Sequence, residues 1–207
     1  MTIDVYADIA CPWCYVGDAR LENALDRRPQ LDVTRRWRPF QLQPTLPPKG
    51  DDFRAVLEEK FGGWNRAQQM FERIREMGAA DGLAFDFEAI DVAPNTADAH
   101  RLVLWAQDRE RGMEMATTLF RAYFSEGKNV SAPEVLVDAA VDVGFDADAA
   151  EALIAGDAYA EAVRESQQRA QRQGVTGVPC YVFGQRHAVV GAQSVEALTE
   201  ALDAASE

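Results

Sequence analysis

The sequence predicts an α/β fold whose sheet is built from both ends of the chain, with a large all-helical insertion between them. The first 48 residues read as strand, helix, strand, and the residues after Gly174 read as strand, strand, helix. Between about residue 51 and residue 173, apolar residues recur at helical spacing almost throughout. We therefore expect one sheet assembled from segments that are distant in sequence.

The N-terminal unit is predicted from three consecutive patterns. Residues 2–8 are rich in β-formers and are short enough for a buried strand. From Pro12 to about residue 28, apolar residues fall near helical spacing, and proline suits a first helical turn. Residues 31–38 read as a second strand, and the prolines that follow indicate an irregular exit.

Two apolar stripes and several capping signals mark the helical segment. Ser131 with Glu134 predicts a capped helix start, Asp146 predicts another start, and Gly156 predicts a break. We expect five or six helices without a repeat period. The stripes are Ala67, Met70, Phe71, Ile74 and Met77, and then Ala116, Leu119, Phe120, Tyr123 and Phe124.

The C-terminal end returns to strand patterns. Residues 178–183 and 188–190 read as strands joined by a turn, and Ser194 is a candidate cap for a final helix. This β-α-β start and β-β-α end are the layout of a thioredoxin-like fold that carries an insertion. We assign residues 1–48 and 174–207 to that unit, and residues 49–173 to an inserted helical subdomain.

Charge and composition exclude several classes of partner. The chain has 34 acidic and 21 basic residues, so its formal charge of −13 would repel phosphate backbones and anionic lipids. No apolar run approaches membrane-spanning length. The charge and the lack of a long apolar run predict a protein that binds neither nucleic acid nor membrane. The N-terminus shows no signal-peptide pattern, so we expect the protein to be cytoplasmic. We expect it to be a monomer or a homodimer.

Cys11 and Cys14 are the candidate catalytic residues. In a reducing compartment, a close cysteine pair is more often catalytic or metal-binding than structural. The spacing puts both sulfurs on one side of a first helical turn, within bonding reach. At the helix N-terminus, Cys11 would be favoured as a thiolate and would attack, while the more buried Cys14 would resolve the mixed disulfide.

The spacing of Cys11 and Cys14 also allows two other interpretations. The cysteines could be buried free thiols at a helix start. A structural zinc site would need four ligands, and beyond the pair the sequence offers only Cys180, His100 and His187, without a second close pair. We therefore expect no metal, and no cofactor other than the redox-active disulfide itself.

Two motifs resemble those of the DsbA-like thioredoxin superfamily, in its FrnE-type branch. They are the Cys-Pro-Trp-Cys sequence after an N-terminal strand and a late Val-Pro before another strand. Further segments resemble the same branch, so the resemblance covers nearly the whole chain. The segments are Cys11-Pro12-Trp13-Cys14, Gly174-Val175-Thr176-Gly177-Val178-Pro179, Phe40-Gln41-Leu42-Gln43-Pro44, Asn95-Thr96 with Ala99-His100-Arg101, and Gly191-Ala192-Gln193.

The resemblance implies roles for residues outside the dithiol. It implies that Pro179 is a cis-proline facing the cysteines and that Val178 offers backbone groups to an extended substrate. It also places His100 in the insertion, near the expected cleft. With Pro12 and Trp13, these three complete our set of candidate substrate-binding residues.

The sequence pattern alone also predicts where the third cysteine and several aromatic side chains lie. Cys180 follows Pro179 in a strand, so it should face the opposite side of the sheet and act as a small buried hydrophobe. Aromatic residues of both parts of the chain are candidates either for an apolar groove or for the core. They are Trp13, Trp37, Phe40 and Trp105.

Three functions are consistent with these features. The leading hypothesis is a thiol–disulfide oxidoreductase that acts on a protein, a peptide or a low-molecular-weight thiol or disulfide. The alternative is a glutathione-dependent isomerase or transferase, because the same fold resembles 2-hydroxychromene-2-carboxylate isomerase and kappa-class glutathione transferase; glutathione would then be a co-substrate. A third is a chaperone-like binding module whose cysteines sense oxidation.

Overall fold

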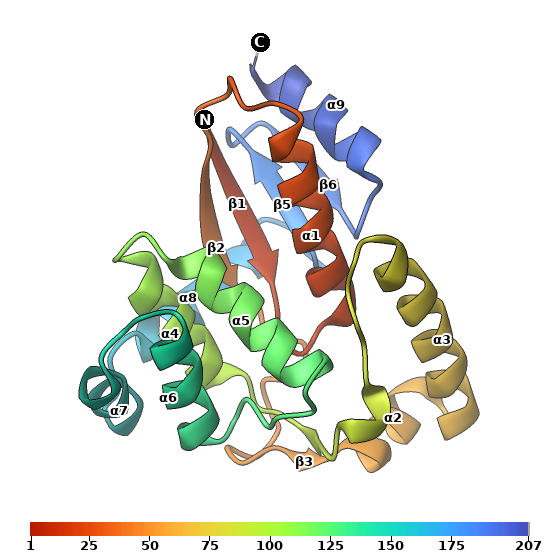
Figure 1. The fold of residues 1–207 in the computed structure, drawn as a ribbon, viewed down its shortest axis with the longest axis vertical. Coiled ribbons are helices and arrows are strands. Elements are labelled where there is room, and N and C mark those ends of the chain that lie inside the picture. The colour runs from red at the N-terminus through yellow and green to blue at the C-terminus, as the bar shows by residue number, and fades with distance from the viewer. Residues whose placement is uncertain (207) are drawn as a thin grey trace.

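The computed structural model describes residues 1–206, and a four-stranded sheet lies at its centre (Figure 1). The strand order is β2-β1-β5-β6. Strands β1 (Thr2–Ala7) and β2 (Thr34–Pro39) are parallel, whereas β5 (Cys180–Phe183) is antiparallel to β1. Strand β6 (His187–Val190) pairs with β5 at one edge. The two ends of the chain therefore meet in the middle of the sheet, as predicted.

Helices cover both faces of this sheet. Helix α1 (Pro12–Asp26) packs beside the C-terminal helix α9 (Val195–Ser206), as Figure 1 shows. Three helices of the insertion contact the edge strand β2: α4 (Ala97–Gln107), α5 (Gly112–Phe124) and α8 (Ala160–Arg172). The insertion is thus attached to the sheet next to the strand that precedes it.

The rest of the insertion contains four helices, one 3-10 turn and a small sheet. The helices are α2 (Phe53–Phe61), α3 (Trp64–Ala80), α6 (Pro133–Asp142) and α7 (Ala147–Ala155), and the turn covers Phe87–Ala89. The antiparallel strands β3 (Asp51–Asp52) and β4 (Val92–Ala93) were not predicted. Two residues are too few to show an alternating pattern.

The core is divided by the sheet. Ile3 and Val5 of β1 point into the main cluster, where Tyr15 of α1 stacks on Phe120 of α5 at 5.3 Å between ring centroids. The next residue of β1, Tyr6, points to the other face, into a smaller cluster that includes Ala170 of α8. This alternation is the period-2 pattern expected of a strand buried on both faces.

The predicted α/β fold with a helical insertion is confirmed, and the local differences have simple causes. Asp146 caps α7 as expected, its side chain accepting a hydrogen bond from the Ala149 amide. Ser131 does not cap α6, because its hydroxyl donates to the Asn129 side chain at 2.6 Å and the helix begins at Pro133. Within residues 1–206, no helix is long and apolar enough to cross a membrane.

Candidate active site

The two cysteines lie where β1 passes into α1. Cys11 is the N-cap residue of α1 in an extended conformation, and Pro12 occupies the first helical position, where a missing amide hydrogen costs nothing. The Cys14 amide donates to the Cys11 carbonyl at 2.9 Å, which closes the first turn. The side chain of Cys11 is therefore held at the amide end of the helix, where negative charge is stabilised.

The loop before β5 contacts the dithiol from the other end of the chain. The Val178–Pro179 peptide bond is cis. The Cys11 sulfur lies 3.7 Å from the Val178 carbonyl oxygen, within reach of a weak S–H hydrogen bond. A Cβ atom placed on Gly17, one turn beyond the dithiol, would lie 3.0 Å from Pro179 Cγ. Pro179 is therefore packed against the same helix that carries both cysteines.

The two cysteines differ in their surroundings. Both are largely buried, with exposures of 4% for Cys11 and 1% for Cys14, and both are free thiols. Burial raises the pKa of the Cys14 thiol well above its usual range, and the hydrogen bond and charge of Cys11 raise it further. Cys14 therefore remains a thiol under neutral conditions, which suits a resolving residue.

An apolar cavity of about 180 Å³ opens beside Cys11. Its walls come from the Cys-Pro-Trp-Cys turn, from α2 and α3, and from the aromatic end of α5. Within residues 1–206, Lys60 is the only charged side chain that lines this cavity. The lining residues are Ala10, Cys11, Pro12, Trp13, Leu42, Phe53, Leu57, Lys60, Phe61, Met70, Phe71, Phe87, Tyr123 and Phe124.

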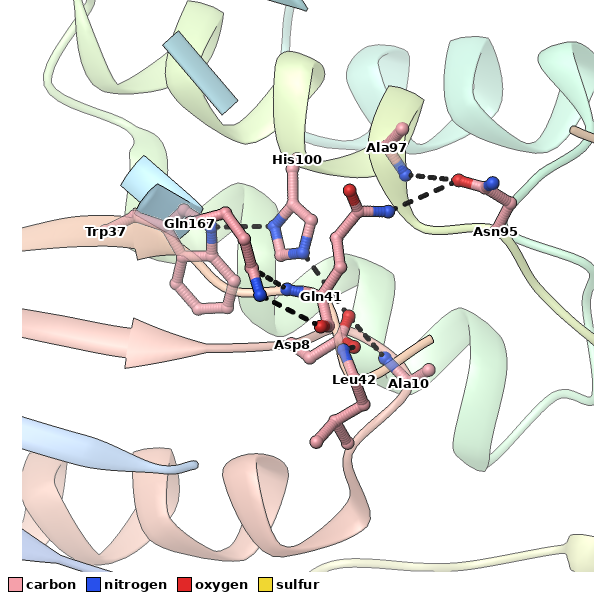
Figure 2. A network of polar contacts seen from close by, with 9 residues as sticks. All are labelled: Asp8, Ala10, Trp37, Gln41, Leu42, Asn95, Ala97, His100 and Gln167. Atoms are coloured by element: carbon pink, nitrogen blue, oxygen red, sulfur yellow. Dashed lines mark hydrogen bonds and ion pairs between the residues drawn. The ribbon is translucent and has the colours of Figure 1, made fainter. Parts of the chain in front are cut away.

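Asp8, three residues before Cys11, belongs to a buried polar cluster (Figure 2). His100 of α4 is 0% exposed, and its Nδ1 accepts a hydrogen bond from Trp37 Nε1 at 3.1 Å. Its Nε2 lies 3.3 Å from Asp8 Oδ1, an ion-pair distance, without meeting hydrogen-bond geometry to any group in residues 1–206. The other carboxylate oxygen of Asp8 accepts from the Leu42 amide at 2.7 Å.

The backbone around this cluster is fixed by amide side chains. The backbone amide of Gln41 donates to Gln167 Oε1 at 2.8 Å. The side-chain Nε2 of Gln41 donates to Asn95 Oδ1 at 3.3 Å. Figure 2 shows both contacts joining the segment after β2 to the insertion, one to helix α8 and the other to the loop before α4. They hold the Leu42 amide in place for Asp8.

The family model of the DSBA-like thioredoxin domain matches residues 2–203. The chain belongs to this family. A probable DsbA oxidoreductase from Streptomyces coelicolor has 35% sequence identity and a TM-score of 0.90, covering 100% of this chain and 90% of that one. The predicted resemblance to the DsbA-like superfamily is confirmed by these two comparisons.

One further sequence and two further solved structures are also similar to this chain. The uncharacterized protein YwbO of Bacillus subtilis is 28% identical over 184 residues, which are 88% of this chain and 86% of YwbO. The cytosolic disulfide reductase DsbM from Pseudomonas aeruginosa, solved with GSH, has 20% identity and a TM-score of 0.65, over 100% of this chain and 96% of its own. A 2-hydroxychromene-2-carboxylate isomerase has 17% identity and a TM-score of 0.76, over 99% and 95%.

The structure brings together most of the predicted site residues of this DsbA-like chain. Pro12 and Trp13 line the cavity beside Cys11, and Val178 and Pro179 lie against the same turn. His100 is not brought to the cavity, because both of its ring nitrogens face buried groups. It therefore has no surface to offer a substrate.

Three of the aromatic residues considered for a groove are core residues instead. Trp37 is fully buried next to His100, Phe40 packs with Tyr6 on the other face of the sheet, and Trp105 packs on Phe145 at 4.5 Å between ring centroids. Only Trp13 of that group lines the cavity. Helical and strand periodicity shows that a side chain is buried, but not whether it borders an empty volume.

Cys180 lies away from the dithiol. It is buried with Tyr6, Phe40 and Ala170 on the face of the sheet opposite the main core, as the alternation of strand residues predicts. Burial raises the pKa of its thiol. Within residues 1–206, no group of three or more His, Cys, Asp or Glu side chains is arranged to hold a metal ion.

Sequence reasoning did not find Asp8 or Lys60. Asp8 precedes Cys11 by three residues at the end of a strand, so a carboxylate next to the dithiol was a usable signal. Lys60 is one of many charges on an amphipathic helix, and nothing in the sequence distinguishes it from the others.

Proposed function

We propose that this chain is a thiol–disulfide oxidoreductase in which Cys11 attacks a substrate disulfide and Cys14 releases the product. The placement of the two sulfurs carries this proposal. Cys11 lies at the cavity and at the helix N-terminus, while Cys14 lies behind it as a fully buried thiol. Membership of the DsbA-like family supports the same chemistry.

The reaction proceeds through a mixed disulfide. The Cys11 thiolate bonds to one substrate sulfur, and the other leaves with the electron pair as a thiolate. Cys14 then loses its proton and attacks Cys11, so that the Cys11–Cys14 bond forms and the second substrate sulfur leaves. Two electrons pass from the protein dithiol to the substrate, and in the reverse direction the protein disulfide oxidises a dithiol.

The cavity indicates what kind of substrate the dithiol meets. Apolar and aromatic side chains dominate its walls, so an apolar group next to the substrate sulfur would be desolvated there. Lys60 offers a cation to a carboxylate or other anionic group on the same molecule. We propose that the substrate is a peptide, or a low-molecular-weight thiol or disulfide, that carries an apolar group. We also propose that the protein acts in the cytoplasm.

A glutathione-dependent isomerase is the second candidate, supported by the likeness to 2-hydroxychromene-2-carboxylate isomerase. At 17% identity that likeness concerns the fold alone. An isomerase of this kind requires one activated group, whereas this chain presents two thiols within one helical turn. The isomerase would not use the second thiol, whereas the oxidoreductase requires it.

The test is to assay one preparation for both activities. We expect the purified protein to accelerate reduction of insulin and of glutathione disulfide by dithiothreitol, with no glutathione-dependent isomerisation of 2-hydroxychromene-2-carboxylate. Isomerisation without any disulfide exchange would contradict the proposal and favour the second candidate.

A further inference from the structure

A groove of about 620 Å³ lies along helices α6 and α7, which pack side by side in the insertion (Figure 1). Its volume falls within the range of about 300–1,000 Å³ that is typical of binding pockets. In the part of the chain that the structure describes, it shares no lining residue with the cavity beside Cys11. The proposed disulfide exchange therefore makes no use of this groove.

The bottom of the groove is apolar. Val137 of α6 and Ile154 of α7 both line it, and both side chains are half-buried. Val141 lies one helical turn after Val137 on the same face of α6, and it is 49% exposed. This face of the helix pair therefore keeps apolar surface in contact with water, and a partner that covers it gains the free energy of burying that surface.

Exposed carboxylates surround the apolar side chains. Glu134 and Asp138 are one turn apart on α6, and Glu151 is one turn before Ile154 on α7. Within residues 1–206, none of these three carboxylates forms an ion pair, and no lysine or arginine lines the groove. Their charges are therefore free to attract a cationic ligand to the apolar surface between them.

Arg101 of α4 holds one wall of the groove in place. This side chain is 5% exposed, and its guanidinium donates to the Gly156 carbonyl oxygen at the end of α7 at 2.7 Å. It also donates to the carboxylate of Asp98, the fourth acidic residue of the lining, at 2.7 Å. Because α7 is fixed to α4 in this way, the groove exists before a partner binds, which lowers the entropic cost of binding.

We propose that this groove is a docking site for a basic amphipathic helix of a partner protein. Apolar side chains of that helix pack on Val137 and Ile154, and its lysines or arginines face the three unpaired carboxylates. The apolar and acidic face of α6 runs from Glu134 to Val141, about 10 Å or two helical turns. A helix fits this surface better than an extended segment, because the walls are helices and offer ridges and grooves rather than a strand edge.

Charge favours this occupant over the others that an apolar groove can hold. A second copy of this chain carries a formal charge of −13, and an anionic membrane is repelled by the same carboxylates. A metal ion is not favoured, because within residues 1–206 no three His, Cys, Asp or Glu side chains are arranged to hold one. A basic amphipathic helix supplies both the cations and the apolar surface that the groove lacks.

The experiment measures binding to the full reduced chain by fluorescence anisotropy at physiological ionic strength. The probe is a labelled synthetic peptide of leucine and lysine with its leucines at helical spacing. The control peptide has the same composition in a shuffled order, so that it has no apolar face. Circular dichroism and thermal unfolding show whether each variant is folded before it is used.

The variants separate charge from apolar contact. One variant removes the three unpaired carboxylates of the groove, and its matched control removes three exposed carboxylates outside the groove. Two further variants each replace a valine of the apolar face of α6, and their control replaces an exposed valine of β6. In this order the variants are Glu134→Gln/Asp138→Asn/Glu151→Gln, Glu72→Gln/Glu76→Gln/Glu200→Gln, Val137→Ser, Val141→Ser and Val190→Ser.

We expect the wild type to bind the amphipathic peptide about tenfold more tightly than the shuffled peptide, because only the first has an apolar face to bury. Loss of the three groove carboxylates should weaken binding of the amphipathic peptide by about tenfold, and the matched triple variant should change it by less than about twofold. Val137→Ser and Val141→Ser should each weaken binding by about three- to tenfold, while Val190→Ser should bind as the wild type does.

Three results would overturn the proposal. Equal binding of the two peptides, or an equal loss in both triple variants, would mean that the acidic surface as a whole attracts cations. Normal binding in both valine variants of α6 would mean that the groove makes no apolar contact. A wild type that dimerises in sedimentation, and becomes monomeric in Val141→Ser, would assign the groove to a second copy of this chain. None of these measurements uses disulfide exchange, so their failure is distinct from a failure of the proposed function.

Discussion

The sulfur of Cys11 lies 3.7 Å from the carbonyl oxygen of Val178, which is 167 residues further along the chain. This contact exists because β1 and β5 are neighbours in the sheet, so that the turn after one strand and the loop before the other share an edge. The helical insertion lies between them in sequence but leaves this contact intact. The reactive sulfur therefore sits at a junction of both chain ends.

Gly17 is required by the packing of Tyr181 against α1. A Cβ atom at this position would collide with the Tyr181 hydroxyl and press on Pro179. We expect Gly17→Ala to lower the free energy of unfolding by about 1–3 kcal/mol, measured by urea denaturation. The double variant with Tyr181→Phe should regain part of that loss, because it removes the colliding oxygen. Equal stability of Gly17→Ala and the wild type would show that the helix shifts without cost.

Asp18 should make stability depend on pH in a definite direction. Burial raises the pKa of its carboxyl, although Arg35 at 3.6 Å and Thr117 act to lower it. A folded-state pKa above the unfolded value means that the stabilising contribution is present at low pH and is lost as pH rises through the folded pKa. The stability of the wild type relative to Asp18→Asn should therefore fall as the pH rises above the ordinary aspartate pKa of about 4. A difference that grows with pH would contradict this.

Cys180 should behave as a core residue. In a Cys11→Ser/Cys14→Ser variant, we expect iodoacetamide to leave the native protein unmodified and to add one mass increment after unfolding, because Cys180 is 2% exposed and its pKa is raised by burial. Cys180→Ala should keep full disulfide-exchange activity at a small cost in stability, of about 1 kcal/mol. Rapid alkylation of the native double variant would instead make Cys180 a candidate third redox residue.

Lys60 should favour anionic substrates specifically. Lys60→Ala removes the cation from the cavity lining, so the first thiolate release from dithiobis(nitrobenzoate) should slow by about two- to fivefold. The rate with uncharged dithiodipyridine should not change, and neither rate should change in Lys49→Ala, which alters a lysine outside the lining. An equal loss of rate with both disulfides would mean that Lys60 acts through the shape of the cavity and not through its positive charge.

The sequence predicted those parts of the site that depend on local spacing. Cys11 and Cys14 are three residues apart in a helix, and a strand before them and a helix after them have clear periodicity. The contact between Asp8 and His100 joins residues far apart in sequence, so it depends on how α4 packs on β2. A histidine on an apolar helix gives no indication of its partner, which is why His100 was assigned to the substrate cleft rather than to the cluster behind it.

The central claim is that Cys11 and Cys14 act in sequence on one substrate, and the Cys14→Ser variant tests it most directly. Without the second sulfur, the mixed disulfide on Cys11 has no internal route to resolution. We predict that Cys14→Ser loses turnover with a disulfide substrate and accumulates a covalent adduct on Cys11, seen as a mass increase that reducing agent removes. Full turnover in Cys14→Ser, with no adduct, would contradict the dithiol mechanism.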